Sequence, residues 1–498
     1  MALCFAAVDL GATSGRVILG RLADGRFLLE ECHRFVHDPL ATGTTLRWDA
    51  DRIFGEVRAG LAEAERRAAA EGGLVGIGVD TWGVDYGLVD ADGRLVVQPY
   101  HYRDSRTDGV PERLGIDASA LYGRCGLQVQ PFNTIYQLVA HAGAPEWVDV
   151  RTLLLMPDLI SHHLTGRRVA EVTMASTTGL LDARTRDWST RTIANLTGLY
   201  GLPLDLVLPD LVEPGTILGP VDRSVVDSGA QVVAVGGHDT ASAIVAVPAT
   251  DSDFAYISSG TWSLVGLELD HPVLTEASAQ ANFTNELGVD GTVRYLKNVM
   301  GLWVLTESIH EWTRQGLDVR LVDLLAEASG LPPLVTVVDM ADQRLIPPGD
   351  MPGRLAAMAA ETGQPVPRTP GEFTRCILDS LALAYRTAIR EACSLAGRTV
   401  DVVHVVGGGS QNTLLCRLTA EATRLPVVAG PAEGTALGNL LVQARALKAL
   451  TGGLADLRGV AAASSSLVRH APGDLGLSQS LWDAAALRLA RPRPVDAV

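Results

Sequence analysis

The chain has 498 residues, of which 47% are apolar and 20% charged, and its formal net charge is −16 at pH 7. The length predicts two domains. The composition is typical of a globular protein of mixed α/β structure and excludes a disordered or coiled-coil chain. The negative charge disfavours partners such as nucleic acid and anionic membranes, so we expect small-molecule partners.

The predicted elements begin with a hairpin. Phe5–Asp9 reads as a buried strand, Gly11–Gly15 as its turn and Val17–Leu22 as a returning strand. From Asp49, apolar residues at three- and four-residue steps predict a helix as far as Ala68, stopped by two glycines, and Val75–Asp80 then starts another strand. A strand-turn-strand unit is not a P-loop, and no Gly-x-x-x-x-Gly-Lys-Ser/Thr segment occurs.

Further elements follow near mid-chain and in the second half. Val232–Val235 predicts a strand that runs through two glycines to a helix starting at Asp239, and Met300–Gln315 predicts a helix. The later pattern is a helix ending near Gly397, a strand, a helix and a strand, over residues 377–392, 402–406, 412–424 and 427–429. Stretches typical of linkers are Pro347–Pro370 and the Pro-rich tail after Arg491.

We place the domain boundary near Val247. The expected ranges are 1–247 for the N-terminal domain, 248–475 for the C-terminal domain, and 476–498 for a C-terminal helix and tail. The six cysteines contain no Cys-x-x-Cys pair, which predicts reduced thiols. There is no basic leader and no apolar run of about 18 residues, so we expect a soluble, cytoplasmic protein.

Three turns rich in glycine, serine and threonine each follow an apolar strand, at Asp9–Arg16, Ser258–Ser263 and Gly407–Asn412. Free N–H groups in such turns cradle phosphate oxygens, so together the turns predict a nucleotide held between two lobes. Each turn alone has a structural alternative. The first is equally consistent with a polar hairpin tip, Thr261 with an ordinary strand residue, and the Gly407 run with packing.

Two carboxylates are candidates for phosphoryl transfer to an alcohol. Asp239, at a helix start behind Gly236-Gly237, is the candidate acceptor of the hydroxyl proton, and its alternative is a helix N-cap with His238 as a turn residue. Asp9, at a strand end beside the first turn, is a candidate water-mediated magnesium ligand or simply a turn former.

Other polar residues are candidates for the site of the phosphoryl acceptor. Asp80–Asp85 combines a tryptophan, a glycine and two acids, which suits a polyol, although Trp82 as core and Asp85 as a loop acid is as consistent. Lys297-Asn298 precedes a predicted helix, with capping as the alternative. His162-His163 and His310-Glu311 lack a metal partner at the required spacing and predict solvated helix faces.

These motifs together resemble the FGGY family of carbohydrate kinases, and within it the branch that acts on L-rhamnulose. The resemblance covers nearly the whole chain, with the motifs in order at Ala7–Arg16, Gly78–Asp85, Tyr102–Thr107, Leu155–Asp158, His238–Ala243, Ser258–Ser263, Lys297–Trp303 and Val406–Asn412. It implies a two-domain, actin-like and ribonuclease-H-like fold, with ATP between the domains and the sugar deeper in the N-terminal one.

The resemblance also implies roles for individual residues. Asp239 would be the proton acceptor. The ATP contacts would be Ala12, Thr13, Ser14, Gly15, Arg16, Thr261 and Gly408, the last with its neighbours Gly407 and Gly409. The sugar site would contain Gly83, His238, Asp239, Thr240 and Asn298. Family members can carry a glutamine that contacts ATP where this chain has Thr306, so that contact is in doubt.

We therefore expect Mg²⁺-dependent transfer of the ATP γ-phosphoryl group to the 1-hydroxyl of L-rhamnulose, in L-rhamnose catabolism. One rival is another sugar kinase of the family, acting on L-fuculose, a ketopentose or a polyol. The other is a non-enzymatic nucleotide switch on the same scaffold. Trp262 and Trp303 are expected to pack rather than touch ligand, and the oligomeric state stays open.

Overall fold

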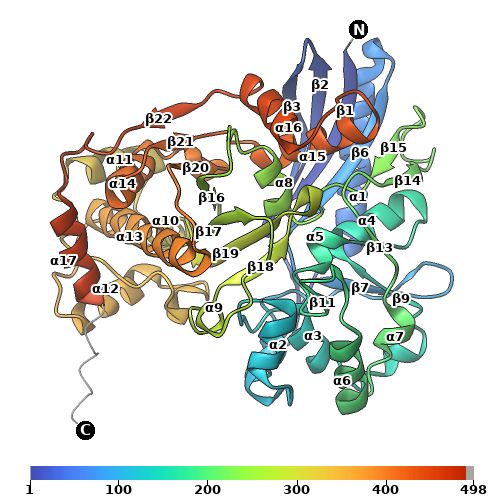
Figure 1. Ribbon diagram of the computed structural model, residues 1–498, viewed down its shortest axis with the longest axis horizontal. Helices are drawn as coiled ribbons and strands as arrows, with labels where there is room; N and C mark the ends of the chain where they lie inside the picture. The colour runs from blue at the N-terminus through green and yellow to red at the C-terminus, as the bar shows by residue number, and fades with distance from the viewer. Residues whose placement is uncertain (1, 490–498) are drawn as a thin grey trace. The chain divides into compact units, whose positions relative to one another are not determined.

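The computed structural model describes residues 2–489 and divides the chain into two compact units (Figure 1). The first unit combines Met1–Thr250, Glu268–Tyr295 and Glu433–Ser465, and the second combines Asp251–Leu267, Leu296–Ala432 and Ser466–Val498. The expected ranges 1–247, 248–475 and 476–498 are consecutive, whereas the units are not. Segments that lie far apart in the sequence complete each unit.

The first unit is built on a six-stranded sheet in the order β14-β15-β6-β1-β2-β3. The central strand β1 pairs antiparallel with β2 and parallel with β6, and β6 pairs parallel with β15. This confirms the predicted hairpin and the strand that follows it. The bounds are β1 Leu3–Leu10, β2 Ser14–Ala23, β3 Arg26–Val36, β6 Leu74–Thr81, β14 Ile217–Pro220 and β15 Gln231–Val233.

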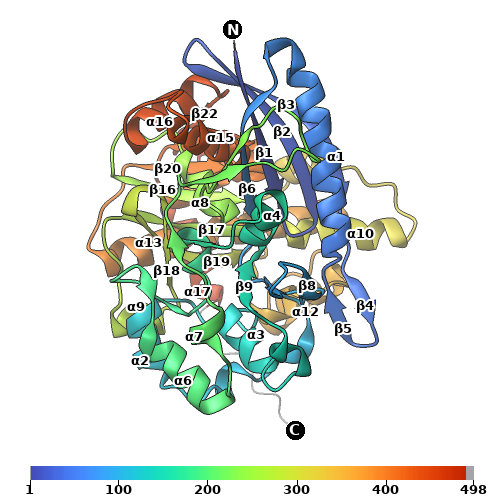
Figure 2. The ribbon, with the colours of Figure 1, turned by 90° about the vertical axis from the view of Figure 1, so that its right-hand side faces the viewer.

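Both faces of this sheet are covered, which explains why β1 is an unbroken apolar run. Helix α1 (Ala50–Ala68) packs on β2 and β3, as Figure 2 shows, and Asp49 caps it by accepting from the Arg52 N–H. On β1, Ala6 and Val8 face the core that contains α1, whereas Phe5 and Ala7 face α15 (Gly434–Ala446). Helix α15 also packs against α8 (Asp239–Val245).

Smaller elements complete the first unit. A three-stranded sheet has the order β8-β7-β9. Its bounds and those of the other strands are β4 Leu40–Thr42, β5 Thr45–Arg47, β7 Tyr86–Val89, β8 Leu95–Val97, β9 Thr152–Leu155, β10 Ala170–Glu171, β11 Leu181–Asp182, β12 Asp187–Trp188, β13 Leu211–Val212 and β18 Thr284–Leu287. The helices are α2 Ala118–Cys125, α3 Thr134–Ala140, α4 Met156–Thr165, α5 Val172–Ala175, α6 Thr190–Tyr200, α7 Leu204–Val207, α9 Glu276–Gln280 and α16 Leu454–Ala463.

The second unit has its own sheet, in which β16 and β20 are parallel neighbours. The order β17-β16-β20-β21-β22 uses β16 Phe254–Ser259, β17 Trp262–Leu269, β20 Val402–Val406, β21 Val427–Ala429 and β22 Val468–His470. Helix α13 (Pro370–Ala396) begins with a Thr369–Glu372 capping box and ends at left-handed Gly397, and α14 spans Thr413–Thr423. The predicted helix, strand, helix and strand of this region are confirmed.

Two expectations for this half were wrong. Lys297 and Asn298 lie inside β19 (Val293–Met300), and the helix starts later, as α10 (Trp303–Arg314). The expected linker Pro347–Pro370 contains α12 (Met351–Glu361), whose first turn is capped by Asp350. The remaining helices are α11 Leu321–Gly330 and α17 Gln479–Leu489, and the Pro-rich tail after Arg491 lies outside the described residues.

A buried ion pair ties helix α13 to the loop after α11. The Arg375 Nε donates to both oxygens of Asp379 at 3.0 Å, and Arg375 Nη1 donates to the carbonyls of Ala328 and Leu331. Asp379 also accepts from the Leu334 N–H. Both carboxylate oxygens and two of the three guanidinium nitrogens therefore have partners, and such hydrogen bonds are the condition under which a buried pair is tolerated.

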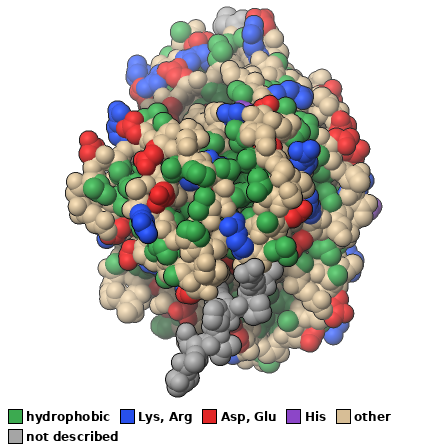
Figure 3. All heavy atoms as spheres, turned by 90° about the vertical axis from the view of Figure 1, so that its left-hand side faces the viewer, with side chains coloured by type: hydrophobic (Ala, Val, Ile, Leu, Met, Phe, Trp, Pro, Cys, Tyr) green, Lys and Arg blue, Asp and Glu red, His purple; other side chains and the backbone are tan. Residues whose placement is uncertain are grey.

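The surface carries charged side chains of both signs (Figure 3). On the face in Figure 3, hydrophobic side chains lie between scattered groups of both charges, without a continuous basic patch. Within residues 2–489, none of the helices is both long and apolar enough to cross a bilayer.

Candidate active site

Asp239 occupies the first turn of α8, behind a glycine pair. The N-cap residue is His238, so the alternative in which Asp239 itself caps the helix does not hold. Gly236 is required by space, because a Cβ there would lie 2.9 Å from the Ser242 N. The Gly237 carbonyl accepts from the Thr81 N–H, which fixes this turn against the end of β6.

The Asp239 side chain is only partly buried, with about a third of it exposed (32%). Its Oδ1 accepts from Thr240 Oγ1 at 3.1 Å and lies 3.4 Å from His238 Nε2. Burial raises the pKa of the Asp239 carboxyl; the His238 charge opposes this rise and the Asp9 charge adds to it. A partly exposed carboxylate with a raised pKa fits a general base.

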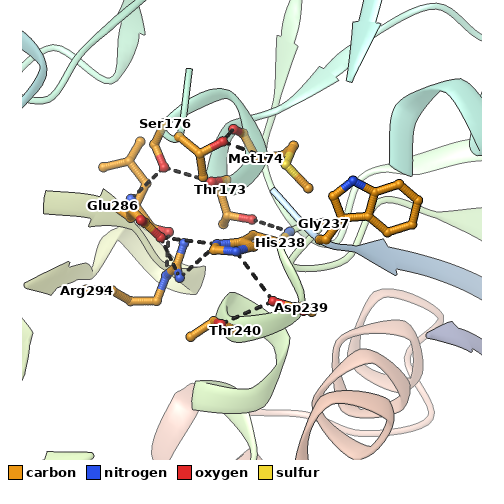
Figure 4. Close-up of polar contacts among 12 residues, drawn as sticks. Thr173, Met174, Ser176, Gly237, His238, Asp239, Thr240, Glu286 and Arg294 are labelled. Carbon is orange, nitrogen blue, oxygen red and sulfur yellow. Dashed lines mark hydrogen bonds and ion pairs between the residues drawn. The ribbon is translucent and has the colours of Figure 1, made fainter. Parts of the chain in front are cut away.

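Behind Asp239, His238 faces a buried ion pair, as Figure 4 shows. Its Nδ1 lies 3.1 Å from Glu286 Oε2 and 3.2 Å from Arg294 Nη1, and these two partners are 2.9 Å apart. Arg294 is fully buried and also donates from Nε to the Leu287 carbonyl. Burial acts to raise the pKa of Glu286, but Arg294 and His238 outweigh it, so that this pKa is lowered.

Glu171 fixes the Gly236-Gly237 turn through hydrogen bonds. Its carboxylate accepts from the N–H groups of Thr173, Met174 and Gly237 and from Thr173 Oγ1, at 2.6 to 3.1 Å. Burial outweighs these hydrogen bonds and raises the pKa of Glu171 to about 7. The buried Asp158 accepts from the Glu171 N–H, and burial raises its pKa as well.

Gly83 lies against the imidazole of His238. A Cβ on Gly83 would approach His238 Nε2 to 3.3 Å, so the backbone of this loop borders the same site. The next residue, Val84, has φ +70, a left-handed conformation that is rare for a β-branched residue. Thr134 Oγ1 donates to the Val84 carbonyl at 2.6 Å and helps to hold that strained turn.

Asp85 is held inside the core by several side chains. It is fully buried, and its carboxylate accepts from Trp48 Nε1 at 2.6 Å, Trp82 Nε1 at 3.0 Å and Gln137 Nε2 at 2.7 Å. Burial outweighs these bonds and raises the pKa of Asp85 to about 6. Of the two readings of Asp80–Asp85, the structure therefore supports packing for Trp82 and Asp85 and leaves Gly83 beside the site.

Two more carboxylates lie near Asp239 at the ends of β1 and β6. Asp80 pairs in register with Asp9, and burial together with the Asp9 charge raises the pKa of Asp80 well above its ordinary range. Asp80 Oδ2 accepts from Asn439 Nδ2 at 2.6 Å, and Oδ1 is buried without a hydrogen bond. Glycine at position 78 leaves room for Asn439, because a Cβ there would lie 2.3 Å from its Oδ1.

The first glycine turn joins β1 to β2. Arg16 bridges Asp9 Oδ2 and Glu433 Oε2, each at 2.5 Å. Gly15 is explained by packing, since a Cβ there would lie 2.4 Å from the Phe35 ring. The backbone bends tightly, with the Gly11 N–H donating to the Ser14 carbonyl. Ala12, Thr13 and Ser14 are at least partly exposed at the tip.

The other two turns meet within the second unit. They follow the ends of the neighbouring parallel strands β16 and β20, and a Cβ on Gly409 would lie 2.0 Å from Ser259 Oγ. Gly407 has φ +81, which favours glycine. Gly408 has open space around its Cα, and Thr261 is partly exposed. The structure therefore brings these two turns together, and their contact with a nucleotide stays a prediction.

Residues at the start of α10 pack against the Thr261 turn. The Trp303 N–H donates to the Thr261 carbonyl at 3.2 Å, and Trp303 Nε1 donates to Leu345, as expected for a packing tryptophan. Thr306 is exposed on α10. Asn298 is partly buried in β19, and Lys297 pairs with Glu391 at 3.0 Å.

The histidine pairs are partly as expected. His163 and His310 are exposed, but His162 is buried and contacts the Gly93 carbonyl at 3.0 Å, so the prediction of a solvated helix face was wrong for His162.

The predicted site residues fall into two groups. Those in the first unit are Asp9, Arg16, Gly83, His238, Asp239 and Thr240, and those in the second are Thr261, Asn298 and Gly408. Sequence reasoning missed Glu171, Glu286, Arg294, Asn439 and Glu433; charged residues inside the apolar strands β18 and β19 were the available signal.

Comparisons with known proteins agree over nearly the whole chain. The family description "FGGY family of carbohydrate kinases" matches in its N-terminal domain at residues 4–246 and in its C-terminal domain at residues 255–447. A protein of Bacteroides thetaiotaomicron named rhamnulokinase is 40% identical, over 97% of each chain. One of Enterococcus faecalis with the same name is 40% identical, over 91% of this chain and 90% of its own.

Solved structures show the same two-domain fold. A gluconate kinase from Lactobacillus acidophilus has a TM-score of 0.78 at 16% identity, with 98% of this chain and 97% of that chain covered. A Plasmodium falciparum glycerol kinase with ADP has a TM-score of 0.77 at 14% identity, with 99% of each chain covered. The expected fold class is thereby confirmed.

Proposed function

We propose that this protein phosphorylates L-rhamnulose with ATP in L-rhamnose catabolism. The premise is that the chain belongs to the FGGY family of carbohydrate kinases. The observation that carries the substrate is the 40% identity to proteins named rhamnulokinase over almost the entire length of both chains. The products are L-rhamnulose 1-phosphate and ADP.

The chemical step needs one acceptor of a proton, and we assign that role to Asp239. The 1-hydroxyl oxygen forms a bond to the γ-phosphorus, the bond from this phosphorus to the bridging oxygen breaks, and ADP leaves. The hydroxyl proton passes to Asp239. Because the contacts with Thr240 and His238 both use Oδ1, we assign Oδ2 as the accepting oxygen.

ATP is assigned to the glycine turns. Ala12–Arg16 would contact the ATP phosphates, and Thr261 and Gly408 would also contact ATP. Arg16 is already held by Asp9 and Glu433, which reduces the entropy lost when it meets a phosphate. The open space at Gly408 supports a close backbone approach to the nucleotide.

Kinases of this family use ATP with a divalent metal, and we assign Mg²⁺. Within residues 2–489, no group of three metal-ligating side chains exists. This fits Mg²⁺, which keeps most of its waters and needs only one or two carboxylates. Asp9 would hold the hydrated ion, which neutralises phosphate charge when bound.

The sugar is assigned to Gly83, His238, Asp239, Thr240 and Asn298. Their placement beside the Glu171-supported turn supports the first four. Asn298 stays a prediction from the family resemblance, and so does the cytoplasmic location.

A substrate panel tests the proposal. ADP release is measured with Mg²⁺-ATP and L-rhamnulose, L-fuculose, L-ribulose, D-xylulose or glycerol. Selective turnover of L-rhamnulose supports the assignment. Preference for another sugar keeps the chemistry and rejects the substrate, whereas silence with all sugars, together with no sugar binding in equilibrium dialysis, favours a nucleotide switch.

A further inference from the structure

The buried pair Glu286–Arg294 has no part in the chemistry described above, yet it contacts the site directly. Both residues come from strands, β18 and β19, that follow His238 by about 50 residues in the sequence. Arg294 is completely buried and Glu286 nearly so. Burying a charged pair is expensive, and hydrophobic residues of similar volume often serve stability as well, so the position of this pair needs a reason.

The reason lies in the two ring nitrogens of His238. Nε2 faces Asp239 Oδ1 at 3.4 Å, and because an ionised carboxylate only accepts hydrogen bonds, this neighbour favours a proton on Nε2. Nδ1 faces a donor and an acceptor at nearly equal distances, Arg294 Nη1 at 3.2 Å and Glu286 Oε2 at 3.1 Å. Which of the two nitrogens is protonated is set by such partners.

We propose that Glu286 and Arg294 are positioning residues that hold the proton of His238 on Nε2, toward Asp239. In the neutral ring, Arg294 donates to the bare Nδ1. In the protonated ring, the carboxylate of Glu286, whose Oε2 lies 3.1 Å from Nδ1, offsets the added positive charge. His238 therefore has a donor to Nδ1 when it is neutral and a negative charge beside Nδ1 when it is protonated, while Nε2 faces Asp239 (Figure 4).

The consequence for Asp239 follows from the signs of the charges. A protonated His238 lowers the pKa of Asp239. Glu286 favours that protonated state and Arg294 opposes it, so the pair sets how basic Asp239 is. Within the first unit, the charged groups that face His238 and Asp239 are Glu286 on β18, Arg294 on β19, Glu171 at the end of β10, Asp9 on β1 and Asp80 on β6.

Two single variants give opposite expectations. Glu286→Gln leaves Arg294 unopposed, disfavours the protonated His238 and moves the acidic limb of the kcat/KM profile to higher pH. Arg294→Gln leaves Glu286 unopposed and moves that limb to lower pH. We expect each shift to be about 0.5 to 1 unit, below the 1 to 3 units of a direct ion pair, because the effect passes through His238.

A matched pair elsewhere in the unit controls for structural damage. Arg458 and Glu268 form an ion pair at 2.7 Å that is buried to a similar degree and lies on other elements than His238. Glu268→Gln and Arg458→Gln should destabilise the protein without moving the limb. Opposite shifts in the test variants support the role; shifts in one direction, or none beyond the controls, overturn it.

The kinetic part rests on the proposed kinase activity, so a second measurement is independent of it. Ring ¹⁵N shifts of histidine-labelled protein without substrate, assigned with His238→Gln, report the tautomer directly. A proton on Nε2 in the wild type supports the role, and a bare Nε2 overturns it. If no sugar is turned over, the proposed function fails while the tautomer result still decides. If Arg294→Gln does not fold, the proposal is decided by the histidine spectrum of the wild type and by the pH profile of Glu286→Gln.

Discussion

Replacing Asp239 by asparagine should separate activity from stability. The amide oxygen can keep accepting from Thr240 Oγ1, now at 3.1 Å, whereas the amide nitrogen cannot accept the hydroxyl proton. A general base supplies a factor of about 10² to 10⁴ in rate, so kcat should fall by that factor, or about 3 to 5 kcal/mol in barrier. ATP affinity should stay within about threefold, because the nucleotide contacts are assigned elsewhere.

The free energy of unfolding of Asp239→Asn should rise slightly while the activity falls. Since the pKa of Asp239 is raised in the folded protein, the ionised carboxylate at neutral pH is less favourable there than in the unfolded chain. The neutral amide removes that cost, and with a third of the side chain exposed the gain in unfolding free energy should be about 0 to 0.5 kcal/mol.

Three measurements on Asp239→Asn check these expectations: ADP release with L-rhamnulose, ATP binding by equilibrium dialysis, and urea unfolding at pH 7.5. Turnover within tenfold of the wild type would remove Asp239 from the role of base. A loss of more than about 2 kcal/mol in unfolding free energy would show that the amide disturbs the glycine turn, contrary to the contacts on Oδ1.

Three further predictions concern the free energy of unfolding and are checked by urea unfolding. Gly438→Ala should lower it by about 1 to 3 kcal/mol or more, because a Cβ would lie 1.8 Å from the Ser242 carbonyl oxygen. Gly459→Ala, in open space on α16, should raise it by about 0.5 to 1 kcal/mol, and equal effects of the two variants would refute the close approach at Gly438. Burial raises the pKa of Glu171 to about 7, so its share of stability, about 3 kcal/mol, is present below pH 4.5 and lost by pH 7; Glu171→Gln should flatten this fall, and an unchanged slope would contradict it. Arg375→Met should cost about 3 to 5 kcal/mol by stranding its buried carboxylate partner, and a cost under about 1 kcal/mol would mean that the pair is solvated.

The elements with strong local signals were predictable. The hairpin of β1 and β2, the capped helix α1 and the long helix α13 each combine an apolar period with a cap or a glycine stop. Lys297-Asn298 failed because a polar pair before an apolar run looks like a helix cap, whereas alternation around Val293 and Tyr295 makes a strand.

The site was predictable only where its residues are local. Asp239, with its glycine pair and following small residues, forms one continuous motif. The partners that define its surroundings, Glu286 and Arg294, contact His238 only through tertiary packing, which no local pattern encodes. For Asp85 the sequence left two readings open, and only the tertiary contacts with Trp48 and Gln137 show that this acid is bonded inside the core.

The interleaved build of the first unit has a consequence for synthesis on the ribosome. Helix α15 fills one face of the first sheet, with Gln443 donating to the Ala6 carbonyl and Asn439 to Asp80. About 180 residues separate Thr250, where the first segment ends, from Glu433, where the segment that contains this helix begins. At about 5 to 20 residues per second, the nascent sheet waits roughly 10 to 40 seconds with that apolar face uncovered. Chaperone dependence of the nascent chain should therefore end once α15 has emerged, well after the second unit has begun to appear.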